Sequence, residues 1–263
     1  FIRIRTMQRN NLISLLDTIF PEVNRLFSSH IRDDGSEKWV DFVWKFWHCQ
    51  CVCELSVKTF TQQYKKWCCK HNYRFKEEKA LDIYTSACGH VCMMPKTETT
   101  KFLVQQAVTQ LNTTSKTIAS ICQQMNMLAA SLPEYTIVMN MYGVGQTLGP
   151  QLIAEIGDVR RFHSKKALIA FAGIDAPPCQ SGSIDVHSRS ISKRGSSSLR
   201  RTLFLVMSVI LQNSPEDEPV YQFMNKKRSE GKPYKVYMLA SANKFLRIYY
   251  SSVKAYLDSL ETD

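Results

Sequence analysis

The chain has 263 residues, of which 44% are hydrophobic, and this composition excludes an intrinsically disordered protein. Its 34 Lys and Arg against 23 Asp and Glu give a formal net charge of +11, which favours a polyanionic partner, with nucleic acid first. No apolar run approaches the roughly 20 residues that span a bilayer, so no membrane partner is expected.

The nine cysteines bear on location and on metal binding. An odd number of cysteines without a secretory signal indicates reduced thiols, and we expect a cytoplasmic protein. Most cysteines fall between positions 49 and 92, with His48, His71 and His90 nearby, which raises the alternative of a zinc site. However, no Cys-x-x-Cys pair occurs, and the spacing at 49–53 departs from that of zinc fingers. We therefore expect small buried apolar side chains and predict no metal site.

Helices are predicted through residues 1–94. Apolar residues at three- and four-residue steps predict a helix over 1–29, which Pro21 interrupts. After a polar turn at 32–38, short helical patterns fill 39–94. Their aromatic side chains are expected in the core, with base-stacking platforms as the alternative. These side chains are Trp39, Phe42, Trp44, Phe46, Trp47, Phe60, Tyr64 and Trp67.

A heptad pattern distinguishes residues 96–132 and predicts a long helix. Two alternatives stay open: a coiled coil that makes a homo-oligomer through 104–132, or an intramolecular hairpin. Small or polar residues in the second seam weaken a free-standing coil. The two seams are Val104, Leu111, Ile118, Met125 and Leu132, and Val108, Ser115, Cys122 and Ala129.

A glycine turn opens the remaining part of the chain. Gly143 and Gly145 precede an amphipathic helix that Gly157 ends, and Arg160 and Arg161 follow it. This pattern is typical of a helix-hairpin-helix, whose backbone N–H groups bind a phosphate without reading base sequence. The alternative is an ordinary tight turn between helices.

Positive charge concentrates between residues 158 and 201, where nine Lys and Arg face three acids. Such cations neutralise phosphates and make binding depend on salt. Ser164 is predicted to cap one helix, and one of Ser196 to Ser198 another. The run Ser-Lys-Arg-Gly at 192–195 therefore places two cations beside a helix start that favours an anion. The nine cations are Arg160, Arg161, Lys165, Lys166, Arg189, Lys193, Arg194, Arg200 and Arg201.

Eight serines crowd the stretch from Pro177 to Arg201, which is predicted to begin as a short β-hairpin or an irregular loop. A serine hydroxyl can attack a phosphodiester when a base or metal activates it and cations offset the phosphoryl charge. Composition does not show which of the eight serines would be the nucleophile. Each could instead cap a helix, form part of a turn or donate a hydrogen bond to a phosphate. After an acidic loop at 214–219, two helices around the turn at 231–233 close the chain.

An ordered set of short motifs covers residues 135–210. They are Gly143 and Gly145, Gly157-Asp158, Arg161-Phe162, Ala172-Gly173, Pro178, Gln180-Ser181-Gly182, Ile191 to Gly195, and Leu199-Arg200. In order and spacing this segment resembles the C-terminal domain of the DEDD-type insertion-sequence transposases, relatives of the Piv/MooV DNA invertases. The resemblance implies DNA transposition, with Ser181 as the nucleophile of a phosphoseryl–DNA link. It also implies oligomers and, for some members, a structured guide RNA.

That family also carries an N-terminal RuvC-like domain, whose four acidic residues bind a divalent metal such as Mg²⁺. No such region is recognised here, because the early acids Asp17, Asp33, Asp34 and Asp41 are predicted in helices or a turn. Tyr142 also replaces the usual proline before the glycine turn. We therefore expect the C-terminal part of a transposase, or a remnant reading frame, with no cofactor in this chain.

The expected fold is mainly α, with a helical and coiled-coil arm at 1–133 and a compact domain at 134–263. The compact domain should hold the helix-hairpin-helix-like element and the Ser/Arg-rich loop or hairpin. A non-catalytic nucleic-acid-binding module and a coiled-coil scaffold are the alternative functions. The expected DNA-binding residues are Gly143, Gly145, Arg160, Arg161, Lys165, Arg189, Lys193, Arg194, Arg200 and Arg201.

Overall fold

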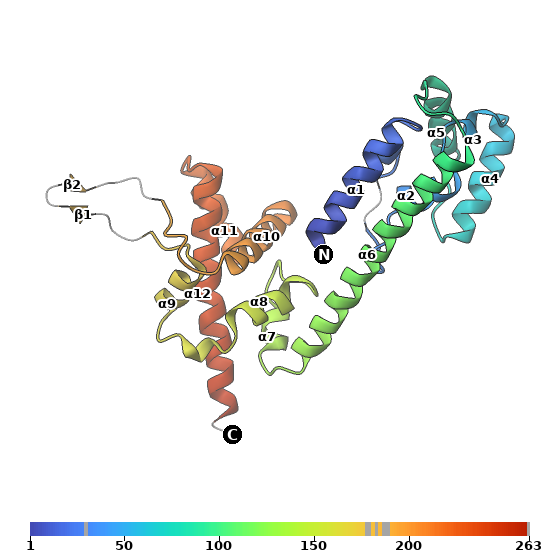
Figure 1. Cartoon of the computed structure of the whole chain (residues 1–263). Helices are drawn as coiled ribbons and strands as arrows, with labels where there is room; N and C mark the ends of the chain where they lie inside the picture. The colour runs from blue at the N-terminus through green and yellow to red at the C-terminus, as the bar shows by residue number, and fades with distance from the viewer. Residues whose placement is uncertain (29–30, 177–179, 182–183, 186–189, 262–263) are drawn as a thin grey trace. The chain divides into compact units, whose positions relative to one another are not determined.

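Figure 1 shows a computed structural model of the chain, which describes residues 1–28, 31–176, 180–181, 184–185 and 190–261. As expected, it is mainly α. The chain divides into two compact units, residues 1–121 (unit 1) and 122–263 (unit 2). The division falls inside helix α6 (Glu98–Ala130), whereas the sequence predicts a boundary after residue 133. It lies earlier because Ala129, near the end of α6, is buried in the core of unit 2.

Unit 1 is built from short helices and the first part of α6. The helix predicted over 1–29 ends at Asp17, ahead of Pro21, and the chain resumes as a short 3-10 helix. Ser56 caps α4, because its hydroxyl accepts a hydrogen bond from the Thr59 N–H at 3.2 Å. The elements are α1 (Ile2–Asp17), η1 (Val23–Leu26), α2 (Lys38–Lys45), α3 (Gln50–Cys53), α4 (Val57–Lys70) and α5 (Glu77–Gly89).

Aromatic rings form the core of unit 1. The ring of Phe42 lies 4.8 Å from that of Phe46 and 5.0 Å from that of Phe27, measured between centroids. Seven of the eight aromatic side chains expected in the core are buried, which confirms the core interpretation for them. The exception is Trp44, which is 45% exposed.

The heptad seam of α6 is used within the chain over its first half. Val104, Val108 and Leu111 are buried in the core of unit 1. Ser115 is also buried, and its hydroxyl accepts a hydrogen bond from Arg5 Nε at 2.9 Å. This half of the seam is therefore covered by the chain's own helices and is not available to a second copy. Leu132 lies beyond the end of α6 and is 42% exposed.

Unit 2 surrounds the long helix α12 (Tyr234–Leu260), which packs against α7, α9, α10 and α11 (Figure 1). The stretch predicted as a hairpin or loop contains two short antiparallel strands, in which Ser181 is opposite Ile184. No helix in the described part of the chain is long and apolar enough to cross a membrane. The other elements are α7 (Tyr135–Met139), α8 (Leu148–Ile156), η2 (Val159–Arg161), α9 (Lys165–Ala172), β1 (Gln180–Ser181), β2 (Ile184–Asp185), α10 (Ser197–Asn213) and α11 (Pro219–Ser229).

Local signals set the helix ends of unit 2. The Ser164 hydroxyl accepts from the Ala167 N–H at 3.2 Å, and the Ser196 hydroxyl from the Leu199 N–H at 3.1 Å. Gly157 ends α8 with a positive φ of 61°. These three predicted helix ends are confirmed, because each depends only on residues within one turn of the helix.

A buried carboxylate joins three elements of unit 1. Glu37 is 8% exposed, and it accepts hydrogen bonds from Arg5 at 2.6 Å and from Trp39 Nε1 at 2.8 Å. Arg9 lies 3.5 Å from the same carboxylate. Since Arg5 also donates to Ser115 of α6, one acid connects α1, the start of α2 and α6.

Replacing this acid should destabilise unit 1. Glu37→Ala leaves the Arg5 guanidinium and the Trp39 indole N–H without their acceptor, so we expect a loss of about 2–4 kcal/mol in unfolding free energy. Denaturant unfolding followed by tryptophan fluorescence measures it, since all four tryptophans lie in unit 1. The matched control is Glu98→Ala, which removes an exposed partner of Lys101 and should cost less than about 1 kcal/mol. Equal losses for the two variants would contradict this role of Glu37.

Candidate nucleic-acid interface

Residues 192–195, here called the basic loop, are bound to the C-terminal end of α9. The Lys193 N–H donates to the Gly173 carbonyl at 3.1 Å, and the Ser196 N–H to the Phe171 carbonyl at 2.6 Å. The Ser192 N–H donates to the Asp175 carbonyl at 2.9 Å. These backbone bonds hold the loop in one position, which is what a preformed binding surface requires.

Two glycines make this close approach possible. A Cβ atom on Gly195 would overlap the carbonyl oxygen of Phe171. Gly173 has a positive φ of 65°, and a Cβ atom there would lie 2.7 Å from the Arg200 guanidinium and 2.8 Å from Gly195 N. Any larger side chain at these positions would push the basic loop away from α9.

The two cations of the basic loop point to solvent. Lys193 adopts a left-handed backbone with φ of 55°, and both Lys193 and Arg194 are exposed. Neither has a carboxylate partner within the described ranges of the chain. They are therefore free to neutralise the charge of a bound anion.

Arg161 adds a planar cation next to the same helix end. Its guanidinium carbon lies 4.7 Å from the ring centroid of Phe162 and 4.8 Å from that of Phe171. Phe171 is the residue whose carbonyl binds Ser196, so Arg161 and the basic loop share one support. Stacking on the rings limits the motion of the guanidinium and leaves its in-plane N–H donors for a phosphate.

Arg160 and Arg200, also expected to bind DNA, have partners inside the protein. Arg160 pairs with Asp158 at 2.9 Å and with Glu261. Its hydrogen bonds hold the pKa of the Asp158 carboxyl below its usual value. Arg200 is half-buried and donates to the Ala172 carbonyl at 3.0 Å. Phosphate binding by Arg160 would have to displace its carboxylates, and Arg200 instead joins α10 to α9.

The remaining predicted cations are more dispersed. Lys165 and Arg201 are exposed. Lys165 begins α9, so it lies about 10 Å along the helix from the end that supports the basic loop. Arg189 lies outside the described residues.

The two glycines of the predicted helix-hairpin-helix turn, Gly143 and Gly145, have different surroundings. Gly143 has a φ of 79°, and a Cβ atom there would lie 2.9 Å from Ile210 Cγ1 and 3.1 Å from the Val206 carbonyl of α10. Gly145 is exposed, and a Cβ atom on it would meet nothing within 4 Å. Gly143 therefore allows the turn to pack on α10, and only the Gly145 side of the turn is open to a ligand.

Two serines of the Ser/Arg-rich stretch bind carboxylates. The Ser192 hydroxyl donates to Asp175, and the Ser196 hydroxyl to Glu155 at 2.9 Å. Glu155 thus lies beside the start of α10, where the sequence predicts that an external anion binds, and that prediction stays untested. The contact could not be read from the sequence, because Glu155 precedes Ser196 by 41 positions.

The proposed nucleophile has a described backbone only. Ser181 lies in β1, opposite Ile184 of β2. Its side chain is outside what the structure describes, so its role stays a prediction.

Two of the early acids accept hydrogen bonds within unit 1. Asp41 accepts from the Tyr73 hydroxyl at 2.6 Å, and Asp34 accepts from the Ser36 N–H at 2.9 Å. Within the described part of the chain, the one group of three potential metal ligands is His48, Cys49 and Cys92. Sulfur and imidazole donors do not suit Mg²⁺, which prefers carboxylate oxygens and water.

Comparison with known proteins finds a family match for one segment of unit 2. Residues 135–222 match the model of the transposase IS116/IS110/IS902 family. This segment contains the glycine turn, α8, α9 and the basic loop. The resemblance to insertion-sequence transposases is confirmed at this level, for this segment.

Individual relatives agree with this class. The chain is 30% identical over 146 residues to the pilin gene-inverting protein of Moraxella bovis, and equally to that of Moraxella lacunata. It is 26% identical over 147 residues to the transposase of insertion sequence element IS1111A of Coxiella burnetii. The matches cover 53% and 56% of this chain, but only 44% of each Moraxella protein and 38% of the Coxiella transposase.

The fit of the basic loop on α9 should depend on Gly195. Gly195→Ala forces the loop off the Phe171 carbonyl, and we expect the melting temperature of unit 2 to fall by at least about 5 °C. Scanning calorimetry measures it, with tryptophan fluorescence identifying the transition of unit 1. Gly145→Ala is the matched control and should change the melting temperature little, because its Cβ atom has open space. The account of the loop fails if both variants melt alike.

Proposed function

We propose that this chain is the DNA-facing part of a transposase or site-specific recombinase. The observation that carries the proposal is an anchored loop with two free cations inside the segment that matches the transposase family. The names of the relatives, which concern DNA inversion and transposition, support the same class. Because the chain spans less than half of these relatives, activity is proposed for the complete assembly.

DNA binding would use the phosphate backbone. Lys193 and Arg194 extend from the basic loop, and Arg161 is fixed on two aromatic rings beside it. These cations would replace counterions along a phosphate strand, and exposed Lys165 and Arg201 would widen the contact. Backbone contacts of this kind position a duplex without reading its bases. We include in this proposal that the turn at Gly145 binds a phosphate through its backbone N–H groups, as in a helix-hairpin-helix.

Catalysis would use Ser181 as the nucleophile. Its Oγ attacks a DNA phosphorus, the Oγ–P bond forms as one P–O ester bond breaks, and the leaving deoxyribose oxygen takes up a proton. The product is a phosphoseryl–DNA link that conserves the ester bond for rejoining. The cations of the basic loop would offset charge on the phosphoryl oxygens. A base to accept the hydroxyl proton would come from the acidic RuvC-like domain that the family resemblance implies.

The proposal includes two further partners, a structured guide RNA and another copy of the chain. A structured guide RNA would present the same phosphate charge as DNA, so the basic loop suits either nucleic acid. Oligomer formation would use the part of α6 beyond Ser115, where Ile118, Cys122 and Met125 are only half-buried.

Removing the loop cations should weaken binding and its salt dependence. Each lost phosphate contact lowers the slope of log K against log salt by about 1, so we expect a change of about 2 for Lys193→Ala/Arg194→Ala. Titrations of duplex DNA and of structured RNA at several salt concentrations measure this slope.

The control for this pair is Lys232→Ala/Lys235→Ala. It removes the same charge from exposed positions of unit 2 around the start of α12. Its slope should stay close to that of the unchanged chain. If both double variants lose binding equally, net charge rather than the basic loop explains the affinity.

The nucleophile has its own test. In reactions supplied with the RuvC-like domain of a related transposase, Ser181→Ala should bind DNA normally yet form no covalent protein–DNA species in denaturing gels. Ser190→Ala removes an exposed hydroxyl from the same stretch and should keep the covalent species. A covalent species that survives Ser181→Ala would rule out this serine.

The alternative is a non-catalytic nucleic-acid-binding module or an inactive remnant. The internal partners of Arg160 and Arg200 favour a structural role for part of the predicted site. This alternative expects salt-dependent binding that is indifferent to base sequence, with no covalent species from any variant.

A further inference from the structure

A cavity in unit 1 is lined by four of the nine cysteines of the chain. It has a volume of about 510 Å³, and it lies between α3 and the segment that follows α5. Two Cys-x-x-x-Cys pairs, 49 with 53 and 88 with 92, contribute to its wall. Its ligand-bearing residues are His48, Cys49, Cys53, Cys88, His90 and Cys92.

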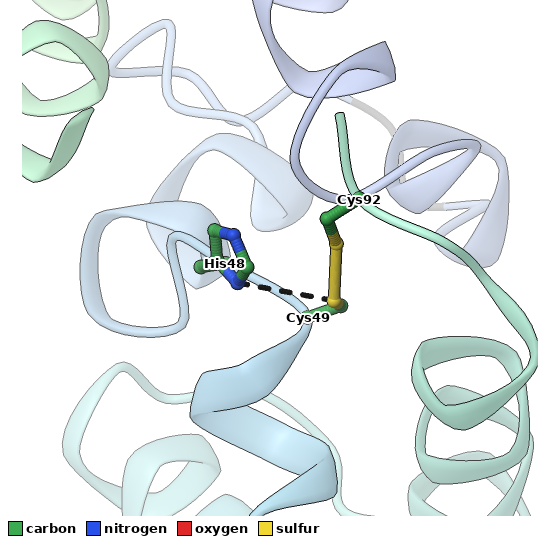
Figure 2. A group of neighbouring side chains, drawn as sticks. All are labelled: His48, Cys49 and Cys92. Atoms are coloured by element: carbon green, nitrogen blue, oxygen red, sulfur yellow. Dashed lines mark hydrogen bonds between the residues drawn. A yellow bond between two sulfur atoms is a disulfide. The ribbon is translucent and has the colours of Figure 1, made fainter. Parts of the chain in front are cut away.

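Three of these residues bring their donor atoms together. The ligand atoms of His48, Cys49 and Cys92 lie within 4.8 Å of one another. His48 and Cys49 are 1% and 3% exposed, so the group is held by packing. Figure 2 shows the His48 imidazole directed toward the Cys49 sulfur, with Cys92 at the other end of the bond between the two sulfur atoms.

Hydrogen bonds orient the imidazole for metal binding. His48 Nε2 lies 3.1 Å from the Met94 carbonyl oxygen, which only accepts, so Nε2 carries the proton. Nδ1 therefore presents its lone pair, 3.8 Å from Cys49 Sγ. A backbone carbonyl on the far nitrogen is the usual outer partner of a zinc-binding histidine. The Gln50 N–H also donates to Nδ1 at 3.1 Å, and metal binding would exchange this bond.

The backbone spacing suits a shared metal ion. Cys49 and Cys92 are joined by a disulfide (Figure 2), with their Cα atoms 7.5 Å apart. Disulfides usually span about 4.4–6.8 Å between Cα atoms. Two thiolates on one tetrahedral zinc ion, each about 2.3 Å from it, lie roughly 3.8 Å apart and accept a wider backbone spacing.

We propose that the dithiol form of unit 1 binds a zinc ion through His48 Nδ1, Cys49 Sγ and Cys92 Sγ. The two thiols release two protons on binding, and the neutral imidazole releases none, so the bound group has no net charge. The fourth ligand would come from the same cavity, where His90, Cys53 and Cys88 are within its wall. Two sulfurs and a nitrogen are the donors that zinc takes in structural sites.

Such a site would connect two segments that both bind the turn after α1. The Cys49 N–H donates to the Ile19 carbonyl at 3.1 Å, and the Met93 N–H donates to the Thr18 carbonyl at 2.8 Å. A zinc ion between Cys49 and Cys92 would fix both segments around the turn that follows α1. The inference is independent of DNA binding, because it concerns unit 1 alone.

Cobalt titration of the whole chain tests the site. The protein is reduced with a phosphine, and Co²⁺ is added as a spectroscopic substitute for zinc. We expect saturation at one ion per chain, a thiolate-to-cobalt charge-transfer band and tetrahedral visible bands, all abolished by one equivalent of Zn²⁺. Absence of these bands in the reduced unchanged chain would overturn the proposal without need of any variant.

Matched variants locate the ligands. Cys92→Ser should lose the charge-transfer intensity and the bound zinc, whereas Cys69→Ser, an exposed free thiol on α4, should keep both. Tryptophan fluorescence shows whether each variant keeps unit 1 folded. Full binding by Cys92→Ser, or reduced protein that binds no metal and reoxidises to a Cys49–Cys92 disulfide, contradicts the site. His90→Ala, Cys53→Ser and Cys88→Ser then identify the fourth ligand.

Discussion

The contact between Gly195 and the carbonyl of Phe171 is the constraint on which the candidate interface depends. It lets the Ser196 N–H reach that carbonyl at 2.6 Å, and α10 begins directly afterwards. The same helix end supports the stacked guanidinium of Arg161. One close backbone approach therefore sets the position of the basic loop and the start of α10, and a third cation stacks on a ring of the same helix end.

Positive charge in unit 2 is divided between two tasks. Arg160 and Arg200 bind acceptors of the protein itself, a carboxylate pair and a helix-end carbonyl. Lys193, Arg194 and Arg161 are exposed, so their charge would be available to an external partner. The electrostatic surface is consequently smaller and more localised than the count of basic residues suggests, and phosphate would be recognised by position rather than by net charge alone.

Unit 1 is stabilised by different interactions. Its core consists of packed aromatic rings, and Glu37 ties α1 to α6 through Arg5. The apolar seam of α6 completes this core, which explains why a heptad pattern need not signal a second chain. The thiol-lined cavity is separate from both features, and a metal there would strengthen the part of unit 1 built from the shortest helices.

The sequence by itself determined what depends on neighbours along the chain. Ser164, Ser196 and Gly157 mark helix ends within a single turn, and the motif order identified the family segment. Only the tertiary structure decided which charges are free and which thiols meet. Glu261 reaches Arg160 and Cys92 reaches Cys49 across long stretches of chain, and the periodicity of a sequence carries no information about such distant pairs.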